Sequence, residues 1–175
     1  TNRGWIVVNE FLETNVPGVY ALGDVKGGPA FTHISYNDFQ IVFHNLTKDE
    51  QTPALSTAGR LVPYALFTDP ELGRVGLTER QAREQGYNVK VGVIPMAWVA
   101  RAIERGDTRG LMKVVVDGDT DRILGAAILG HGGGELVQTL MAVMWADAPW
   151  TLFSKAMYIH PTMTEGFFTL MDNVA

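Results

Sequence analysis

The first 50 residues alternate between apolar segments and turn-forming residues in a pattern that predicts two strands and one helix. Trp5–Val8 and Val19–Leu22 are short apolar segments rich in β-forming residues, and the second ends at Gly23. A short apolar run closed by glycine is typical of a strand that is buried on both faces. Apolar residues then recur at helical spacing from Thr32 to Leu46, which predicts a helix. Its expected apolar side consists of Ile34, Ile41, Val42, Phe43 and Leu46.

A polar segment follows this helix and indicates a boundary between two domains. Residues 47–60 read TKDEQTPALSTAGR, with Pro53 in the middle and few apolar positions. Such clusters between periodic segments are typical of loops and linkers. We therefore place the boundary near residue 50, with one domain over residues 1–50 and a second over residues 51–175.

The second domain combines both periodicities in an order that predicts an α+β fold. Thr78 and Gln81 match a capping box at the start of one helix, and Gly86 is a suitable stop for it. Two apolar runs flank the turn-rich DGDTD at residues 117–121, which predicts a hairpin. The expected elements are strands over 63–67, 73–77 and 88–96, a hairpin over 110–130, and helices over 77–87, 133–148, 151–156 and 162–173. This order indicates an antiparallel sheet with helices packed on one face.

The helix expected over residues 133–148 is apolar enough to have two interpretations. It carries Met141, Met144 and Trp145. A large apolar helical face fits either the hydrophobic core of a domain or an interface between subunits. The pattern alone leaves both open.

Composition narrows the range of functions. Hydrophobic residues make up 46% of the 175 residues, enough for a substantial core. The net charge is −5 and no basic stripe is present, which argues against a nucleic-acid partner. No apolar run reaches the roughly 18 residues that a membrane span needs. The chain has no cysteine, which excludes disulfides and thiol nucleophiles within it, and its histidines lack metal-ligand spacing.

A histidine and a glutamate lie close together in YIHPTMTEGFF, residues 158–168. Pro161 disfavours helical backbone at His160, so the imidazole is expected just before the helix that follows. Thr162 and Glu165 match a capping box, in which Glu165 only satisfies a backbone amide. The same spacing suits a proton-handling pair, because a carboxylate on one ring nitrogen fixes the tautomer and stabilises the imidazolium. From this segment alone both interpretations remain open.

The neighbours of this pair are mostly aromatic or apolar. Side chains of this kind are expected to exclude water from a site that handles protons. They are Tyr158, Ile159, Phe167 and Phe168.

The letters HPTMTE resemble the His-Pro-Thr-x-x-Glu motif near the C-terminus of the flavoprotein disulfide reductases. These are the relatives of dihydrolipoamide dehydrogenase, glutathione reductase and mercuric reductase. In that family the histidine is the acid/base partner of a reactive thiol and the glutamate orients it. The resemblance therefore implies catalytic roles for His160 and Glu165, with the histidine of one subunit reaching the flavin and disulfide of the other.

The stretch TNVPGVYALGD, residues 14–24, resembles the second flavin-binding motif of the same family. The resemblance implies that Gly23 permits close approach of the backbone and that Asp24 accepts a hydrogen bond from a ribityl hydroxyl. The helix that starts near Thr32 would aim its N–H groups at the pyrimidine side of the flavin, close to His33. The alternatives are an ordinary Gly-Asp turn and, for His33, a capping or surface role.

Residues 67–91 and 101–138 resemble the dimerisation domain of this family, so the resemblance covers about residues 5–173. It implies an antiparallel α+β domain preceded by a fragment of an α/β FAD-binding domain. It also implies FAD and NAD(P)H as cofactors of the complete enzyme, a homodimer and a cytoplasmic location, with no metal site in this chain.

The sequence lacks three features of complete members of this family. They are the N-terminal G-x-G-x-x-G, the redox cysteine pair and the nicotinamide-binding domain. We therefore interpret the chain as the C-terminal part of such an oxidoreductase, expected to be inactive alone and to bind FAD poorly. The alternative is a non-catalytic homodimerisation module.

Overall fold

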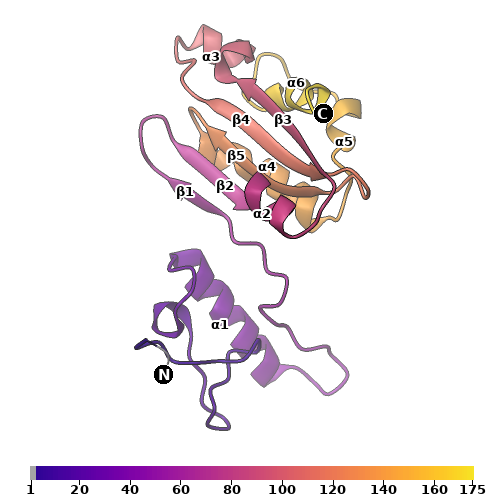
Figure 1. Cartoon of the computed structure of the whole chain (residues 1–175). Helices are drawn as coiled ribbons and strands as arrows, with labels where there is room; N and C mark the ends of the chain where they lie inside the picture. The colour runs from indigo at the N-terminus through magenta and orange to yellow at the C-terminus, as the bar shows by residue number, and fades with distance from the viewer. Residues whose placement is uncertain (1–2) are drawn as a thin grey trace. The chain divides into compact units, whose positions relative to one another are not determined.

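The computed structural model describes residues 3–175 and divides the chain into two compact units, Thr1–Val62 and Pro63–Ala175 (Figure 1). The first unit is built around one long helix, and the second around an antiparallel sheet.

The division after Val62 lies later in the chain than the boundary expected near residue 50. Hydrogen bonds tie the intervening residues to the first unit. The Asn45 side chain donates to the Leu55 carbonyl and accepts from the Leu55 amide, both at 2.8 Å. The Thr57 amide donates to the Glu10 carbonyl at 2.9 Å. The polar composition of this segment therefore marks a loop that folds back.

Helix α1 (Thr32–Thr47) is the main element of the first unit and confirms the helix expected there. Ile34, Ile41 and Val42 are buried on one side of it. The latter two form a small core with Leu12, a residue of the irregular chain before the helix. Burial of this apolar side stabilises α1 more than its intrinsic helix propensity does.

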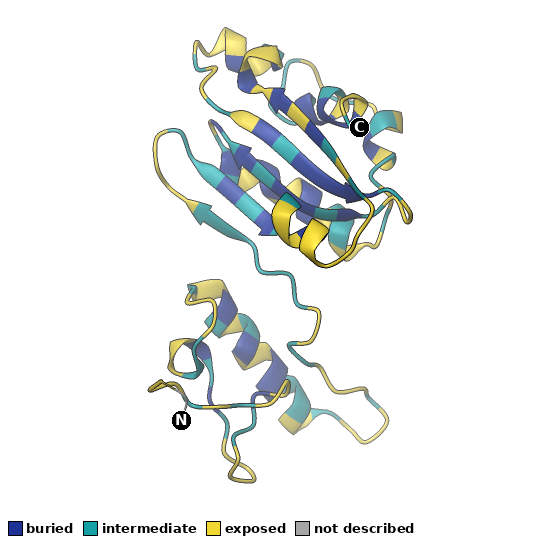
Figure 2. Ribbon diagram, viewed as in Figure 1, coloured by how far each residue is buried: buried dark blue, intermediate teal, exposed yellow. Residues whose placement is uncertain are grey.

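The expectation that Phe43 and Leu46 are also buried is wrong. Their exposed fractions are 57% and 62%. A helix with 3.6 residues per turn places Phe43 on the side opposite Ile34, so only part of the apolar pattern can face the core. Buried and exposed positions alternate along α1 for this reason (Figure 2).

Neither strand expected before this helix forms in the described residues. Trp5–Val8 and Val19–Leu22 are irregular, and an isolated antiparallel bridge between Glu13 and Tyr20 joins the second segment to the preceding chain. A strand requires a neighbouring backbone to complete its hydrogen-bond ladder. The first residue of the second segment is 49% exposed, so this segment is not buried on both faces.

A five-stranded antiparallel sheet with the order β1-β2-β5-β4-β3 forms the centre of the second unit. All the strands and the β4–β5 hairpin lie where the apolar pattern predicted them, which confirms the fold class. The strands are β1 (Tyr64–Leu66), β2 (Leu72–Gly76), β3 (Val89–Pro95), β4 (Leu111–Asp117) and β5 (Ile123–Leu129).

Helices α4 (Gly133–Trp145) and α6 (Gly166–Asp172) cover one face of this sheet (Figure 1). Gly73 in β2 allows α4 to pack closely, because a Cβ atom there would overlap the backbone at the start of α4. At Gly92 in β3, a Cβ atom would lie 2.7 Å from a carbonyl oxygen of α6. The strand registers put both glycines on the same face. Glycine at these positions thus sets the spacing between sheet and helices.

Helix α4 contributes to the core along one side only. Leu136, Val137, Leu140 and Met141 are buried, whereas Trp145 is 67% exposed. Part of the apolar surface of α4 therefore belongs to the hydrophobic core of the second unit.

The shorter helices surround this framework. The capping box of Thr78 and Gln81 is present at the start of α2, as predicted. The shorter helices are α2 (Glu79–Glu84), η2 (Met96–Trp98), α3 (Ala100–Glu104) and α5 (Leu152–Lys155). None of the helices in the described part of the chain has the length and hydropathy of a membrane-spanning segment.

Candidate functional site

The side chains of His160 and Glu165 point toward one another. His160 Nδ1 lies 2.9 Å from Glu165 Oε2. The histidine side chain is 71% exposed, whereas the glutamate side chain is only 18% exposed. A carboxylate in this position fixes the ring tautomer and leaves the other ring nitrogen, Nε2, available to a second molecule.

The turn before α6 holds Glu165 in place. The Thr162 amide donates to Glu165 Oε1 at 3.4 Å, and the Glu165 amide donates to Thr162 Oγ1 at 3.2 Å. The capping contacts and the histidine contact thus use different oxygens of one carboxylate. The two interpretations of this segment are therefore compatible.

The helix itself begins later than expected. Its first residue is Gly166, so Thr162 does not occupy the N-cap position and the reciprocal hydrogen bonds brace a turn instead. Gly166 packs closely against the strands and loop beside it, because a Cβ atom there would lie 2.9 Å from Val99 and 3.2 Å from Met112. This close packing holds the backbone next to Glu165, whose side chain is largely buried.

A cavity of about 300 Å³ adjoins Glu165. Trp98, Tyr158 and Phe168 supply its aromatic lining. Burial raises the pKa of Tyr158, whose hydroxyl donates to the Phe153 carbonyl at 3.1 Å. The phenol is therefore a neutral hydrogen-bonding group beside the pair.

The expectation that neighbouring side chains exclude water from the pair is wrong for this chain alone. Phe167 is fully buried in the core, whereas Ile159 is 79% exposed and Phe168 is 44% exposed. Apolar residues that are close to His160 in the sequence thus differ in burial, and they do not form one cover over it. Exclusion of water would require a second surface to cover this region.

The Gly23–Asp24 sequence lies in the 3-10 turn η1 (Gly23–Lys26) of the first unit. Gly23 is buried with φ +68, and a Cβ atom there would lie 2.7 Å from Ser35 Oγ in α1. Both the backbone conformation and the close packing require glycine. Asp24 is exposed, and its carboxylate has no hydrogen bond or ion pair with the described residues. It is therefore available as an acceptor.

Thr32 and His33 lie exposed in the first turn of α1. The residue before them, Phe31, provides no side-chain cap, and no acidic residue occupies the first turn. The His33 ring stacks on the Phe31 ring with centroids 5.3 Å apart. The positive end of this helix can thus face an electron-rich ligand.

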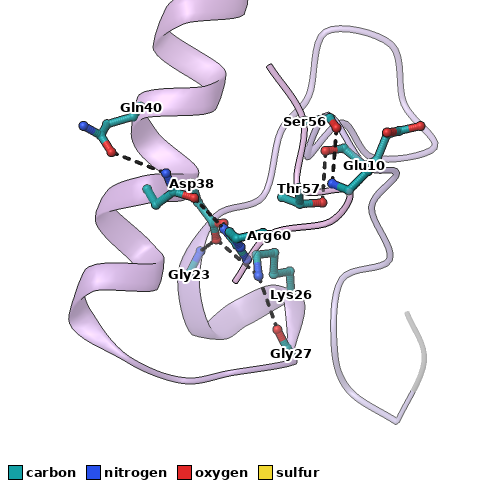
Figure 3. Close-up of polar contacts among 11 residues, drawn as sticks. Glu10, Gly23, Lys26, Gly27, Asp38, Gln40, Ser56, Thr57 and Arg60 are labelled. Atoms are coloured by element: carbon teal, nitrogen blue, oxygen red, sulfur yellow. Dashed lines mark hydrogen bonds and ion pairs between the residues drawn. The ribbon is translucent and has the colours of Figure 1, made fainter. Parts of the chain in front are cut away.

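A buried charged cluster beside η1 was missed by sequence reasoning. Asp38 is fully buried, and Lys26 and Arg60 converge on its carboxylate (Figure 3). The available signal was its position on α1: Asp38 lies between Ile34 and Ile41 on the apolar side of the helix. A charged residue at such a position is buried only if partners satisfy it.

The structure brings some of the expected site residues together. His160 contacts Glu165, and Gly23 packs against α1, while the Asp24 carboxylate has no hydrogen bond or ion pair among the described residues. The histidine pair and the Gly23–Asp24 turn belong to different compact units. No group of three or more potential metal ligands is found within residues 3–175.

Two family models match this sequence. Residues 62–171 match the pyridine nucleotide-disulphide oxidoreductase dimerisation domain, and residues 1–38 match the pyridine nucleotide-disulphide oxidoreductase model. The first match contains the whole sheet and the His160–Glu165 pair. The second contains the Gly23–Asp24 turn and Asp38.

Characterised proteins are similar over nearly the whole chain. The probable pyridine nucleotide-disulfide oxidoreductase RclA of Escherichia coli (strain K12) is 40% identical over 173 residues, which is 98% of this chain and 38% of that protein. The dihydrolipoyl dehydrogenase of Thermus scotoductus is 38% identical over 170 residues, 94% of this chain and 34% of that protein. The human mitochondrial dihydrolipoyl dehydrogenase is 35% identical over 165 residues. The chain spans only 32% to 38% of the length of these relatives.

Solved structures agree with these similarities. The HOCl-induced flavoprotein disulfide reductase RclA from Escherichia coli superposes with a TM-score of 0.89 at 39% identity, covering 98% of this chain and 39% of that one. LpdA from Mycobacterium tuberculosis superposes with a TM-score of 0.81 at 18% identity, covering 96% of this chain and 36% of that one, and supports the fold alone.

Proposed function

The chain belongs to the pyridine nucleotide-disulphide oxidoreductase family, and on this premise we propose that it supplies the dimer interface and an acid/base pair of an FAD-dependent NAD(P)H:disulfide reductase. The observation that carries the proposal is the 2.9 Å contact between His160 Nδ1 and Glu165 Oε2. The imidazole is braced on one side and exposed on the other. This arrangement suits proton exchange with a group that another subunit presents.

The proposed chemistry is a proton transfer at His160 Nε2. The chain contains no cysteine, so the thiol that this nitrogen serves lies outside these 175 residues, and the proposal assigns it to the partner subunit. The neutral imidazole accepts the thiol proton, which leaves a thiolate and an imidazolium, and the Glu165 carboxylate stabilises the imidazolium. The partner's thiolate attacks the substrate disulfide and forms a mixed disulfide with one half of it, and the imidazolium returns its proton to the thiolate that leaves as the other half. No net charge builds up over the cycle.

The Gly23–Asp24 turn and the start of α1 are the proposed cofactor contacts of this chain. When bound, FAD passes electrons from NAD(P)H to the redox disulfide. The exposed Asp24 carboxylate suits a ligand hydroxyl, and the positive end of the α1 dipole, at Thr32 and His33, suits an electron-rich ring edge. The donor set therefore fits part of a flavin site, and we do not expect this chain alone to hold FAD.

A homodimer is the proposed assembly. Met157 and Ile159, on the segment that leads to His160, are 98% and 79% exposed. Burial of such apolar side chains under a second subunit lowers the free energy of the assembly. The same cover would remove water from around His160 and Glu165, which this chain alone does not do.

The proposal is tested by replacing His160 in a complete enzyme that contains this segment. His160→Ala should lower turnover by about 100-fold or more, because the thiol loses its proton partner. The size of the loss should vary with pH. Steady-state kinetics across a pH series measure both quantities. His131→Ala is the matched control, since His131 is also exposed but lies in a loop before α4.

The dimer should remain intact in both variants, as checked by sedimentation. A His160→Ala enzyme with wild-type turnover would favour the alternative, in which this chain is a homodimerisation module without a catalytic role.

A further inference from the structure

The Asp38 carboxylate holds both ends of the η1 turn. Its Oδ2 atom accepts from the Gly23 amide at 2.9 Å and lies 3.2 Å from Lys26 Nζ. Its Oδ1 atom accepts from Arg60 Nη1 at 2.6 Å. Gly23 and Lys26 are the first and last residues of the turn. Asp24 lies between them in the sequence of the turn. Figure 3 shows the contacts of Asp38 with Gly23 and with Lys26.

This cluster is unusually well buried for charged side chains. The side chain of Asp38 is fully buried, and those of Lys26 and Arg60 are 8% and 15% exposed. Removing such charges from water costs free energy, which ion pairs and hydrogen bonds roughly offset. An apolar residue at position 38 would fill the same side of α1 without that cost. Stability alone therefore does not account for an aspartate at this position.

What an apolar residue could not do is fix the turn. The close packing of Gly23 on Ser35 fixes its position against α1, and the amide contact with Asp38 fixes its orientation. The ion pair with Lys26 anchors the other end. Asp24 is left exposed on a turn that α1 holds at both ends.

We propose that Asp38 is a positioning residue that holds the Asp24 carboxylate in place for its cofactor. This inference rests on the proposed role of Asp24 as a contact to a flavin hydroxyl. Asp38 is buried and touches no ligand itself. Its effect on cofactor binding would therefore be indirect, and the proposal assigns that effect to the Asp24 carboxylate.

A double-mutant cycle in the complete enzyme tests this dependence. Asp24→Ala and Asp38→Asn should each weaken FAD binding by about tenfold, which is the loss of roughly one charged hydrogen bond. The double variant should bind FAD no more weakly than Asp24→Ala, because Asp38 then has no contact left to position. Titration of the apoenzyme with FAD, followed by flavin fluorescence, gives the dissociation constants.

A matched control removes a buried carboxylate elsewhere. Asp117 is 5% exposed in the second unit and accepts from Thr120 Oγ1 at 2.6 Å. Asp117→Asn should leave FAD affinity within about twofold of wild type even if it lowers stability, since its contacts stay within the β4–β5 turn.

A second variant tests the inference if Asp38→Asn does not fold. Lys26→Met keeps the aliphatic stem and removes the ion pair with Asp38, together with the 3.5 Å contact of Lys26 Nζ with the Gly27 carbonyl. It should also weaken FAD binding, by less than Asp38→Asn, and lose that effect in the Asp24→Ala background.

The outcomes separate the inference from the function on which it rests. Additive losses for Asp24→Ala and Asp38→Asn, or wild-type affinity in Asp38→Asn, would overturn the positioning role. If Asp38→Asn does not fold, wild-type affinity in Lys26→Met would do so. Wild-type affinity in Asp24→Ala would instead overturn the proposed cofactor contact itself.

Discussion

Glu165 serves two neighbours at once through its two oxygens. One oxygen contacts His160 and the other accepts from the Thr162 amide. A capping role and an orienting role usually compete as explanations for a glutamate at this spacing. Here they act together, because a carboxylate that is held by the turn loses less conformational entropy on pairing with the histidine.

Two substitutions at this residue separate its roles. Glu165→Gln should keep the contact with Thr162 but cannot stabilise an imidazolium, so turnover should fall at least about tenfold with little change in stability. Glu165→Ala should lower turnover and also destabilise the fold by about 0.5–2 kcal/mol, as for loss of a cap. Kinetics and chemical unfolding of both variants measure the difference. Equal turnover in Glu165→Gln and wild type would leave only the structural role.

For single residues, the sequence predicted which side chains pair better than it predicted which side chains are buried. The family motif anticipated the contact of His160 with Glu165, although the spacing alone left a purely capping role for Glu165 open. Burial was harder to predict. Phe43 and Ile159 are apolar yet exposed, and Asp38 is charged yet fully buried. Burial of each side chain depends on which side of its helix or loop packs against the rest of the fold. Residues distant in the sequence decide this packing.

The elements differ in how far local pattern determines them. The sheet of the second unit formed as expected, because all its strands have partners within the same chain. Trp5–Val8 and Val19–Leu22 have strand-like composition but no complete ladder, and they are irregular. The start of α6 moved from Thr162 to Gly166 because the hydrogen bonds of a capping box also stabilise an isolated turn. Composition thus predicts which segments favour a strand or a helix, but the element forms only where the rest of the fold supplies its partners.

A surface ion pair links two loops of the second unit and gives it a pH-dependent stability. Arg109 contacts Asp107 at 2.8 Å and Asp69 at 2.7 Å. The hydrogen bond from Arg109 lowers the pKa of Asp107 from 3.8 to about 2. A carboxyl whose pKa is lowered by folding stabilises the native state above its unfolded pKa. That contribution is lost as the pH falls from about 4 to about 2.

Asp107→Asn should therefore flatten the acid dependence of stability in this range. The difference in free energy of unfolding between wild type and variant should shrink as the pH falls from 5 to 2. Chemical unfolding at several pH values measures it, with the exposed Asp172→Asn as the control. A difference that stays constant with pH would contradict the assigned cause. The effect should be small, because exposed ion pairs contribute little.

The whole molecule consists of two units with different relations to the proposed site. The second unit carries the His160–Glu165 pair on an antiparallel framework, and the first carries the Gly23–Asp24 turn braced by Asp38. The motifs of the family resemblance pointed to His160 with Glu165 and to Gly23 with Asp24, whereas the brace by Asp38 was not anticipated. Exposure of His160 and of the apolar side chains around it could not be read from the motif, since it reflects the surfaces that this chain alone leaves uncovered.

Mixed dimers of a complete enzyme test most directly whether the histidine of one subunit serves the thiol of the other. One parent subunit carries His160→Ala, and the other carries serine in place of the redox cysteines, so one homodimer has at most about 1% of wild-type turnover and the other has none. If the histidine acts across the interface, each mixed dimer assembles one intact site, and we predict that activity appears on mixing. Mixed dimers as inactive as both parents, with their assembly confirmed by native mass spectrometry, would contradict the account.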